Sequence, residues 1–130
     1  PYIFTASPPP PVIAAARAAL SRLLRGDDLR AQLWKNMGRF NAAVTRLGYR
    51  TGSKDPGPVT ALVFGERQDA IAHWQGLLDA GIYTNLMVPP ATPAGLNIVR
   101  ISLSAAHTDA QISRMIEAFE QLAARLRPAA

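Results

Sequence analysis

One arginine stands on the polar side of an otherwise apolar segment. Residues 97–104 read Asn-Ile-Val-Arg-Ile-Ser-Leu-Ser, with apolar and polar side chains in near alternation. This pattern predicts a strand with Val99, Ile101 and Leu103 on a core-facing side and Arg100 on the opposite side, toward solvent or a second domain. A guanidinium on such a face matches the two oxygens of a carboxylate. Arg100 is therefore a candidate receptor for an acidic ligand, and a cross-strand surface pair is the alternative.

A proline-rich loop is expected directly before this strand, over residues 88–96. A stiff loop beside a polar strand face can shape a binding site, or it can simply connect two strands. The candidate loop residues are Pro89, Pro90, Ala91, Thr92 and Pro93.

The two histidines do not predict a metal site. His107 precedes residues 108–111 (Thr-Asp-Ala-Gln), which fit a helix capping box, and we expect it to position that turn. His73 lies beside Trp74 in an expected helix. No H-x-x-x-H spacing or carboxylate cluster accompanies either ring, so we predict no metal.

No complete catalytic set is present in the sequence. It contains no cysteine, which excludes disulfides, thiolate metal sites and cysteine nucleophiles. It also lacks the G-x-S-x-G, P-loop and G-x-G-x-x-G motifs. Lys35, on the polar side of a helix, and Lys54, in a turn, lack the desolvated pocket of a Schiff-base lysine. We therefore expect no catalysis from this segment alone.

Composition favours one globular domain rather than a disordered chain. Of 130 residues, 48% are hydrophobic and 18% charged, which is ample for a core. The net charge of +5 comes from basic residues spaced along helices, so nucleic-acid binding is the least favoured function. No apolar run reaches the roughly 18 residues of a membrane span, and the start shows no signal-peptide pattern. The chain opens on Pro1 rather than Met, so we expect it to derive from a longer polypeptide.

Hydrophobic periodicity predicts the elements that position Arg100. Helices are expected over 10–25, 28–47, 68–80 and 109–127, and strands over 59–64, 82–87 and 97–104. Asp27 is the expected N-cap of the second helix. The expected inward side of the third helix consists of Ile71, Trp74, Leu77 and Leu78. This order predicts an α+β fold: a small antiparallel or mixed sheet of about three strands, covered on one face by helices and preceded by a long connecting helix.

Three stretches together resemble the α-oxoamine synthases. Residues 2–9 (Tyr-Ile-Phe-Thr-Ala-Ser-Pro-Pro) are similar to the segment that follows the cofactor lysine in that family. Residues 99–108 (Val-Arg-Ile-Ser-Leu-Ser-Ala-Ala-His-Thr) resemble its C-terminal strand-to-helix motif. Residues 89–95 look most like the mobile loop of bacterial serine palmitoyltransferases. The resemblance covers essentially the whole chain.

The resemblance implies a pyridoxal-phosphate (PLP) enzyme of the aspartate aminotransferase fold type I. Such enzymes are homodimers that condense an amino acid with an acyl-CoA and release CO₂, with the cofactor as electron sink. Arg100 matches the family's anchor for the amino-acid carboxylate. Thr5 and Ser7 match a segment that reaches the cofactor phosphate of the partner subunit. Residues 89–93 would close over the substrate-bound cofactor.

The sequence departs from the serine palmitoyltransferase pattern at Val88, where an arginine is expected. The Schiff-base lysine, the ring-stacking histidine and the pyridinium-binding aspartate belong to upstream regions outside this chain. The resemblance thus implies residues 1–25 as an interdomain segment and connecting helix, and residues 26–130 as a C-terminal small α+β domain, inactive alone.

The implied reaction is the condensation of L-serine with an acyl-CoA to a 3-oxo-amine, for sphingolipid biosynthesis. Its setting would be cytoplasmic, with membrane contact only through a lipid product. 8-Amino-7-oxononanoate synthase and 2-amino-3-ketobutyrate CoA ligase are alternatives within the family. A stand-alone α+β module that binds a small acid through Arg100 is the alternative outside it.

Overall fold

A computed structural model describes residues 3–92 and 95–126. The chain divides into two compact units, residues 1–31 and 32–130. The division falls within helix α2 (Asp27–Arg46), six residues beyond the boundary expected at 25/26. Among the described residues, no helix is both long and apolar enough to span a bilayer.

The first unit contains helix α1 (Pro10–Leu24), which opens at Pro10 as predicted. Proline suits a first helical turn because the N–H it lacks would have no partner there. No residue of α1 is buried. Its apolar side chains are all more than half exposed: Val12, Ile13, Leu20, Leu23 and Leu24. Residues of this helix thus take no part in the buried core of the described chain.

The start of α2 differs by one residue from the prediction. Asp27 is the first residue of the helix rather than its N-cap. The Gly26 carbonyl already accepts from the Arg30 amide, so Gly26 stands where the first helical hydrogen bond begins. The Asp27 carboxylate instead pairs with the Arg30 guanidinium one turn later.

The second unit contains a three-stranded antiparallel sheet in the order β1-β3-β2. Its strands are β1 (Val59–Phe64), β2 (Asn85–Met87) and β3 (Asn97–Ser102). The central strand β3 pairs with β1 along its whole length, but with β2 only from Ile98 to Arg100. The short β2 corrects the expectation of a strand from residue 82. The carbonyl of Thr84 accepts a hydrogen bond from Trp74 Nε1 at 3.2 Å instead of joining the ladder.

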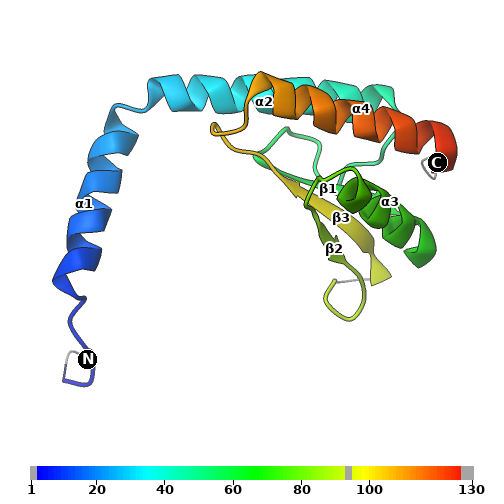
Figure 1. The fold of residues 1–130 in the computed structure, drawn as a ribbon. Coiled ribbons are helices and arrows are strands. Elements are labelled where there is room, and N and C mark those ends of the chain that lie inside the picture. Colours follow the sequence, from blue (N-terminus) through cyan, green and yellow to red (C-terminus); the bar gives the residue numbers. More distant parts are fainter. Residues whose placement is uncertain (1–2, 93–94, 127–130) are drawn as a thin grey trace. The chain divides into compact units, whose positions relative to one another are not determined.

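The helices gather on one side of this sheet, as predicted (Figure 1). They are the second part of α2, α3 (Arg67–Asp79) and α4 (Asp109–Leu126). Val99 and Ile101 of β3 and Leu103 directly after it are buried beneath them, whereas Arg100 is exposed on the opposite side. The capping box that opens α4 is confirmed, since Gln111 N donates to Thr108 Oγ1 at 3.2 Å and Thr108 N to Gln111 Oε1 at 2.9 Å.

The predicted inward side of α3 is correct at Leu77, which is buried, and at Trp74, which packs against the core, and it is wrong at Ile71 and Leu78. Ile71 and Leu78 are 39% and 40% exposed, whereas Ala70, His73 and Leu77 are buried. The reason is aromatic packing. The His73 ring lies 4.7 Å from the Phe64 ring and 5.6 Å from the Tyr49 ring, centroid to centroid. This contact turns His73 into the core and the two aliphatic side chains outward.

Candidate functional site

A cleft of about 500 Å³ lies where β3 continues past the end of β2. One wall is the segment 81–85, which leads into β2, and the floor is formed by residues 100–102 of β3 and by Leu103 directly after it. The other wall comes from His107 and the first two turns of α4. The cleft thus joins the two features singled out in the sequence, Arg100 and His107.

Arg100 carries a positive charge that no described carboxylate neutralises. Its side chain is exposed, and Nη2 donates to Asn85 Oδ1 at 3.2 Å on the neighbouring strand. The two residues are direct cross-strand partners. The expected surface pair therefore exists, but with a neutral amide. A neutral partner leaves the guanidinium charge uncompensated and available to an anion.

His107 holds the turn before α4, as predicted. Its Nδ1 accepts a hydrogen bond from Ser104 N at 3.0 Å. An imidazole nitrogen that accepts from an N–H carries no hydrogen itself, so the neutral ring has its hydrogen on Nε2. The ring is half-buried and lines the cleft. Its tautomer is thus assigned from the hydrogen-bond partner.

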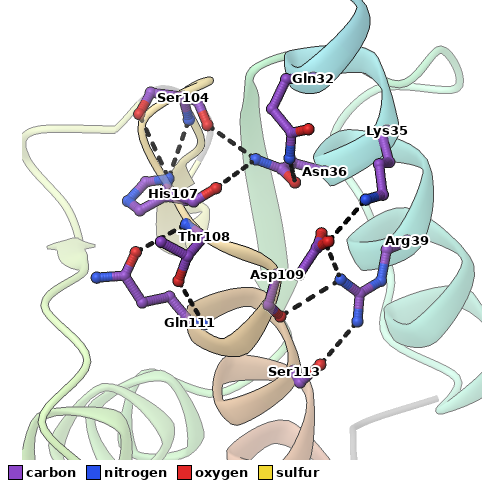
Figure 2. A network of polar contacts seen from close by, with 10 residues as sticks. All are labelled: Gln32, Lys35, Asn36, Arg39, Ser104, His107, Thr108, Asp109, Gln111 and Ser113. Carbon is purple, nitrogen blue, oxygen red and sulfur yellow. Dashed lines mark hydrogen bonds and ion pairs between the residues drawn. The ribbon is translucent and has the colours of Figure 1, made fainter.

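A buried asparagine on α2 secures the same turn, as Figure 2 shows. Asn36 is fully buried, and its Nδ2 donates to the carbonyls of Ser104 and His107, both at 3.0 Å. Gln32 Nε2 in turn donates to Asn36 Oδ1 at 3.0 Å. Sequence reasoning missed Asn36. The available signal was its position three residues after Leu33 and four before Phe40, within the apolar stripe of α2.

A second, exposed connection joins α2 to the start of α4 (Figure 2). The Asp109 carboxylate pairs with Lys35 Nζ at 2.7 Å and with Arg39 Nη1 at 3.2 Å. Arg39 Nη2 also donates to Ser113 Oγ at 2.7 Å. The hydrogen bond from Lys35 is the main cause that lowers the pKa of Asp109. Lys35 is thus engaged in an ion pair at the surface.

The expected loop lies at the opposite end of the β2–β3 hairpin from His107. Ala91 N donates to Val88 O at 2.9 Å, and the buried Thr92 hydroxyl donates to the Leu96 carbonyl. None of the described loop residues Pro89, Pro90, Ala91 and Thr92 lines the cleft. Pro93 lies outside the described residues. The roles expected for this loop stay predictions.

Thr5 and Ser7 lie in the other unit, in the extended, exposed segment ahead of α1. Both carry a hydroxyl that can donate to a phosphate oxygen. Their expected contact with a cofactor phosphate stays a prediction.

Comparison with known proteins identifies the family. Residues 1–119 match the model of the aminotransferase class I and II family, and the chain belongs to this family. A serine palmitoyltransferase of Caulobacter vibrioides is 42% identical over 126 residues, which are 97% of this chain and 31% of that protein. An 8-amino-7-oxononanoate synthase of Ralstonia pickettii is 38% identical and covers 98% of this chain and 32% of its own length.

Solved structures agree in fold. A serine palmitoyltransferase of Sphingomonas wittichii superposes with a TM-score of 0.86 at 40% identity, over 95% of this chain and 31% of that one. A second serine palmitoyltransferase, from S. paucimobilis and with PLP bound, gives a TM-score of 0.87 at 36% identity, over 96% and 32%. The α+β fold of this chain is therefore shared with these enzymes. The chain spans about a third of the length of the curated relatives it matches.

Proposed function

We propose, from the chain's membership in the aminotransferase class I and II family, that it is the C-terminal part of a PLP-dependent acyltransferase of the serine palmitoyltransferase type. The whole enzyme would condense L-serine with an acyl-CoA, with loss of CO₂, to a 3-oxo-amine for sphingolipid synthesis. The identity of 42% to a serine palmitoyltransferase, against 38% to an 8-amino-7-oxononanoate synthase, supports this choice. The latter activity is the second candidate, because Val88 replaces the arginine expected before the loop.

Within this enzyme, Arg100 binds the carboxylate of the amino-acid substrate. The observation that carries this role is an exposed guanidinium in a cleft, with a neutral amide as its partner. A carboxylate can occupy two guanidinium donors at once, which fixes the orientation of the amino acid as well as its affinity. The chain's contribution to catalysis is then to hold the substrate in one pose.

The chain fits PLP only as a secondary contributor. Thr5 and Ser7 offer exposed hydroxyls that suit phosphate oxygens, and we assign them to the cofactor phosphate of a partner subunit in a homodimer. When bound, PLP supplies the electron sink for the substrate's Cα carbanion. Lys35 is engaged with Asp109 and Lys54 lies in an exposed turn, so the cofactor-binding lysine would come from another part of the enzyme.

The loop containing Pro89, Pro90, Ala91, Thr92 and Pro93 would cover the bound substrate and exclude water. Its prolines restrict the backbone of the open loop, so the loop would lose less conformational entropy when it closes. We place the enzyme in the cytoplasm, with membrane contact only through its lipid product. These assignments rest on the family resemblance of the loop and of residues 2–9.

The test is an absorbance titration of the native-length protein with PLP bound. L-Serine is added first to the wild type and then to Arg100→Ala, with Arg100→Lys as the control that keeps the charge but loses the planar fork. We expect a cofactor band that shifts with serine, and a roughly 10- to 100-fold weaker apparent affinity in Arg100→Ala. A shift with glycine but not serine would favour another family member. Absence of a cofactor band would leave a small-acid-binding module as the function.

A further inference from the structure

The side of His107 that faces away from the turn carries an unused donor. Nδ1 is occupied by the Ser104 amide, which leaves the hydrogen on Nε2. None of the described residues offers Nε2 a hydrogen-bond partner. The ring lines the cleft that also contains Arg100. A neutral donor and a cation therefore share one cleft.

The other polar side chains of the α4 wall, Gln111 and Arg114, each use one polar atom for contacts within the fold. Gln111 Oε1 accepts from the Thr108 amide, which closes the capping box. Arg114 Nη2 donates to the Ala80 carbonyl at 2.8 Å and so bridges α4 to the segment after α3. His107 thus presents the free ring donor of this wall.

Asn36 of α2 fixes the backbone that carries the His107 ring. Asn36 donates to the carbonyl of His107 itself and to that of Ser104, the residue whose amide binds the ring (Figure 2). Because Asn36 is fully buried, these bonds are shielded from water. The backbone on both sides of the imidazole is therefore held, and the donor direction is set before any ligand binds.

We propose that His107 is a second ligand-binding residue, a neutral imidazole whose Nε2–H donates to a carboxylate oxygen of the ligand that Arg100 binds. Arg100 supplies the charge, and His107 supplies a directed donor without adding a second charge. The proposal rests on the proposed function, because it takes the carboxylate of the amino-acid substrate as the ligand. To hold the turn, residue 107 needs only a hydrogen-bond acceptor for the Ser104 amide. A purely structural role therefore does not explain why a second ring nitrogen with a hydrogen is present.

Two amide substitutions separate the two nitrogens. His107→Asn places an amide oxygen near the Nδ1 position, so it can still accept from Ser104 N, but it loses the Nε2 donor. His107→Gln places its amide near the Nε2 position and loses the acceptor for the turn. Both are made in the native-length protein with PLP bound. Apparent affinity for L-serine is read from the cofactor absorbance, and thermal stability from the apo protein.

We expect His107→Asn to bind L-serine about tenfold more weakly at nearly unchanged melting temperature, since one hydrogen bond to a charged group is lost. We expect His107→Gln to retain more of the serine affinity and to melt at a lower temperature. Affinity within twofold of wild type in His107→Asn would overturn the proposal. So would an equal loss of affinity and of melting temperature in both variants, which is the result of a purely structural role.

A ligand without the carboxylate identifies the contact. 2-Aminoethanol has the amine and hydroxyl of serine but no carboxylate, so we expect His107→Asn to bind it as the wild type does. Equal weakening for both ligands would overturn the proposal. Arg100→Ala is titrated in parallel: if its serine affinity is unchanged, the proposed function fails. If only Arg100→Ala is weakened and His107→Asn is not, the inference on His107 fails by itself.

The tautomer can be read without cofactor or substrate. In the native-length protein, ¹⁵N labelling of the imidazoles gives one ring system for each histidine in a nuclear magnetic resonance spectrum. At neutral pH we expect one ring, absent in His107→Asn, to carry its hydrogen on Nε2. A hydrogen on Nδ1 of that ring would overturn the proposal, because the donor would then point at the turn rather than into the cleft.

Discussion

The two histidines occupy regions of opposite character. His107 is half-buried at a cleft, and its Nδ1 accepts from a backbone N–H at 3.0 Å. His73 is fully buried in α3, and its Nδ1 lies 2.8 Å from the Asp69 carbonyl oxygen. A carbonyl can only accept, so the hydrogen of His73 is on Nδ1. One backbone partner thus reverses the tautomer between two side chains of the same type.

The difference extends to the second ring nitrogen. His107 lines a cleft, and none of the described residues binds its Nε2. Nε2 of His73 is buried next to Phe64 and Tyr49, and it has no hydrogen-bond partner among the residues that the structure describes. Burial lowers the pKa of His73, although its hydrogen bond to the Asp69 carbonyl acts in the opposite direction. The lesson is that His73 serves as a core side chain, whereas His107 retains a nitrogen for chemistry.

The largest effect should come from opening the core region. Phe64→Ala removes the ring closest to His73 and is expected to lower the free energy of unfolding by about 3–5 kcal/mol. Because water would then reach the cavity, the pKa of His73 should move back toward its ordinary value. Urea unfolding at neutral pH measures the first effect. A loss below about 1 kcal/mol would mean that Phe64 does not enclose His73.

A smaller loss is expected from the support of His107. Asn36→Ala leaves the buried carbonyls of Ser104 and His107 without their donor and should cost about 1–3 kcal/mol. In the same variant, a smaller fraction of the His107 rings should carry the hydrogen on Nε2, whereas the tautomer of His73 should be unchanged. Urea unfolding and imidazole ¹⁵N shifts measure the two effects. Gln32→Ala, which removes only the outer member of the network, is the matched control and should lose less.

The burial of His73 should also make stability depend on pH. The folded-state pKa of His73 lies below the unfolded value of about 6.5, so the unfolded chain binds more protons as the pH falls. The free energy of unfolding should therefore decrease as the pH drops below about 6.5. The contribution of His73 to this decrease should end once the pH is below its pKa in the folded protein.

His73→Phe retains an aromatic ring without a titrating nitrogen and should flatten this part of the stability curve. Unfolding curves collected between pH 7 and pH 5 give the comparison with the wild type. If the slope survives in His73→Phe, the dependence belongs to another group.

The smallest effect is expected at the exposed ion pair behind the His107 turn. Lys35→Ala removes one partner of Asp109 and should cost little stability, because both side chains are solvated. The loss should shrink further at high salt. The lowered pKa of Asp109 means that its contribution is present above its ordinary value near 3.9 and disappears as the pH falls through the folded pKa. Melting temperatures at low and high salt measure it, and a large fall in melting temperature would show a much stronger pair.

Much of the site could be predicted from local patterns. The alternation in residues 97–104 predicted that Arg100 is exposed opposite a buried face, and the structure confirms it. The capping box and the role of His107 in the turn were also correct, because their partners lie within three residues along the chain. Gly48 and Gly81 end their helices at φ values of 81° and 76°, which few other residues adopt readily.

What remained hidden depends on partners distant in sequence. Asn36 and the carbonyls it binds are separated by 68 and 71 residues. The residue at which β2 begins depends on the indole of Trp74, which binds the Thr84 carbonyl ten residues away. The inward side of α3 depends on rings contributed by β1 and by the segment before it.

Sequence by itself determined which segments form helices and strands, and that Arg100 faces away from the core. Hydrophobic periodicity and helix capping involve residues that are close in sequence, so each can be recognised from the sequence of a single helix or strand. Tertiary structure alone decided that a buried amide of α2 supports the His107 turn, and that His73 rather than Ile71 enters the core. A helix with apolar residues on two adjoining sides can turn either toward a sheet, and only the shape and polarity of the partner elements select one.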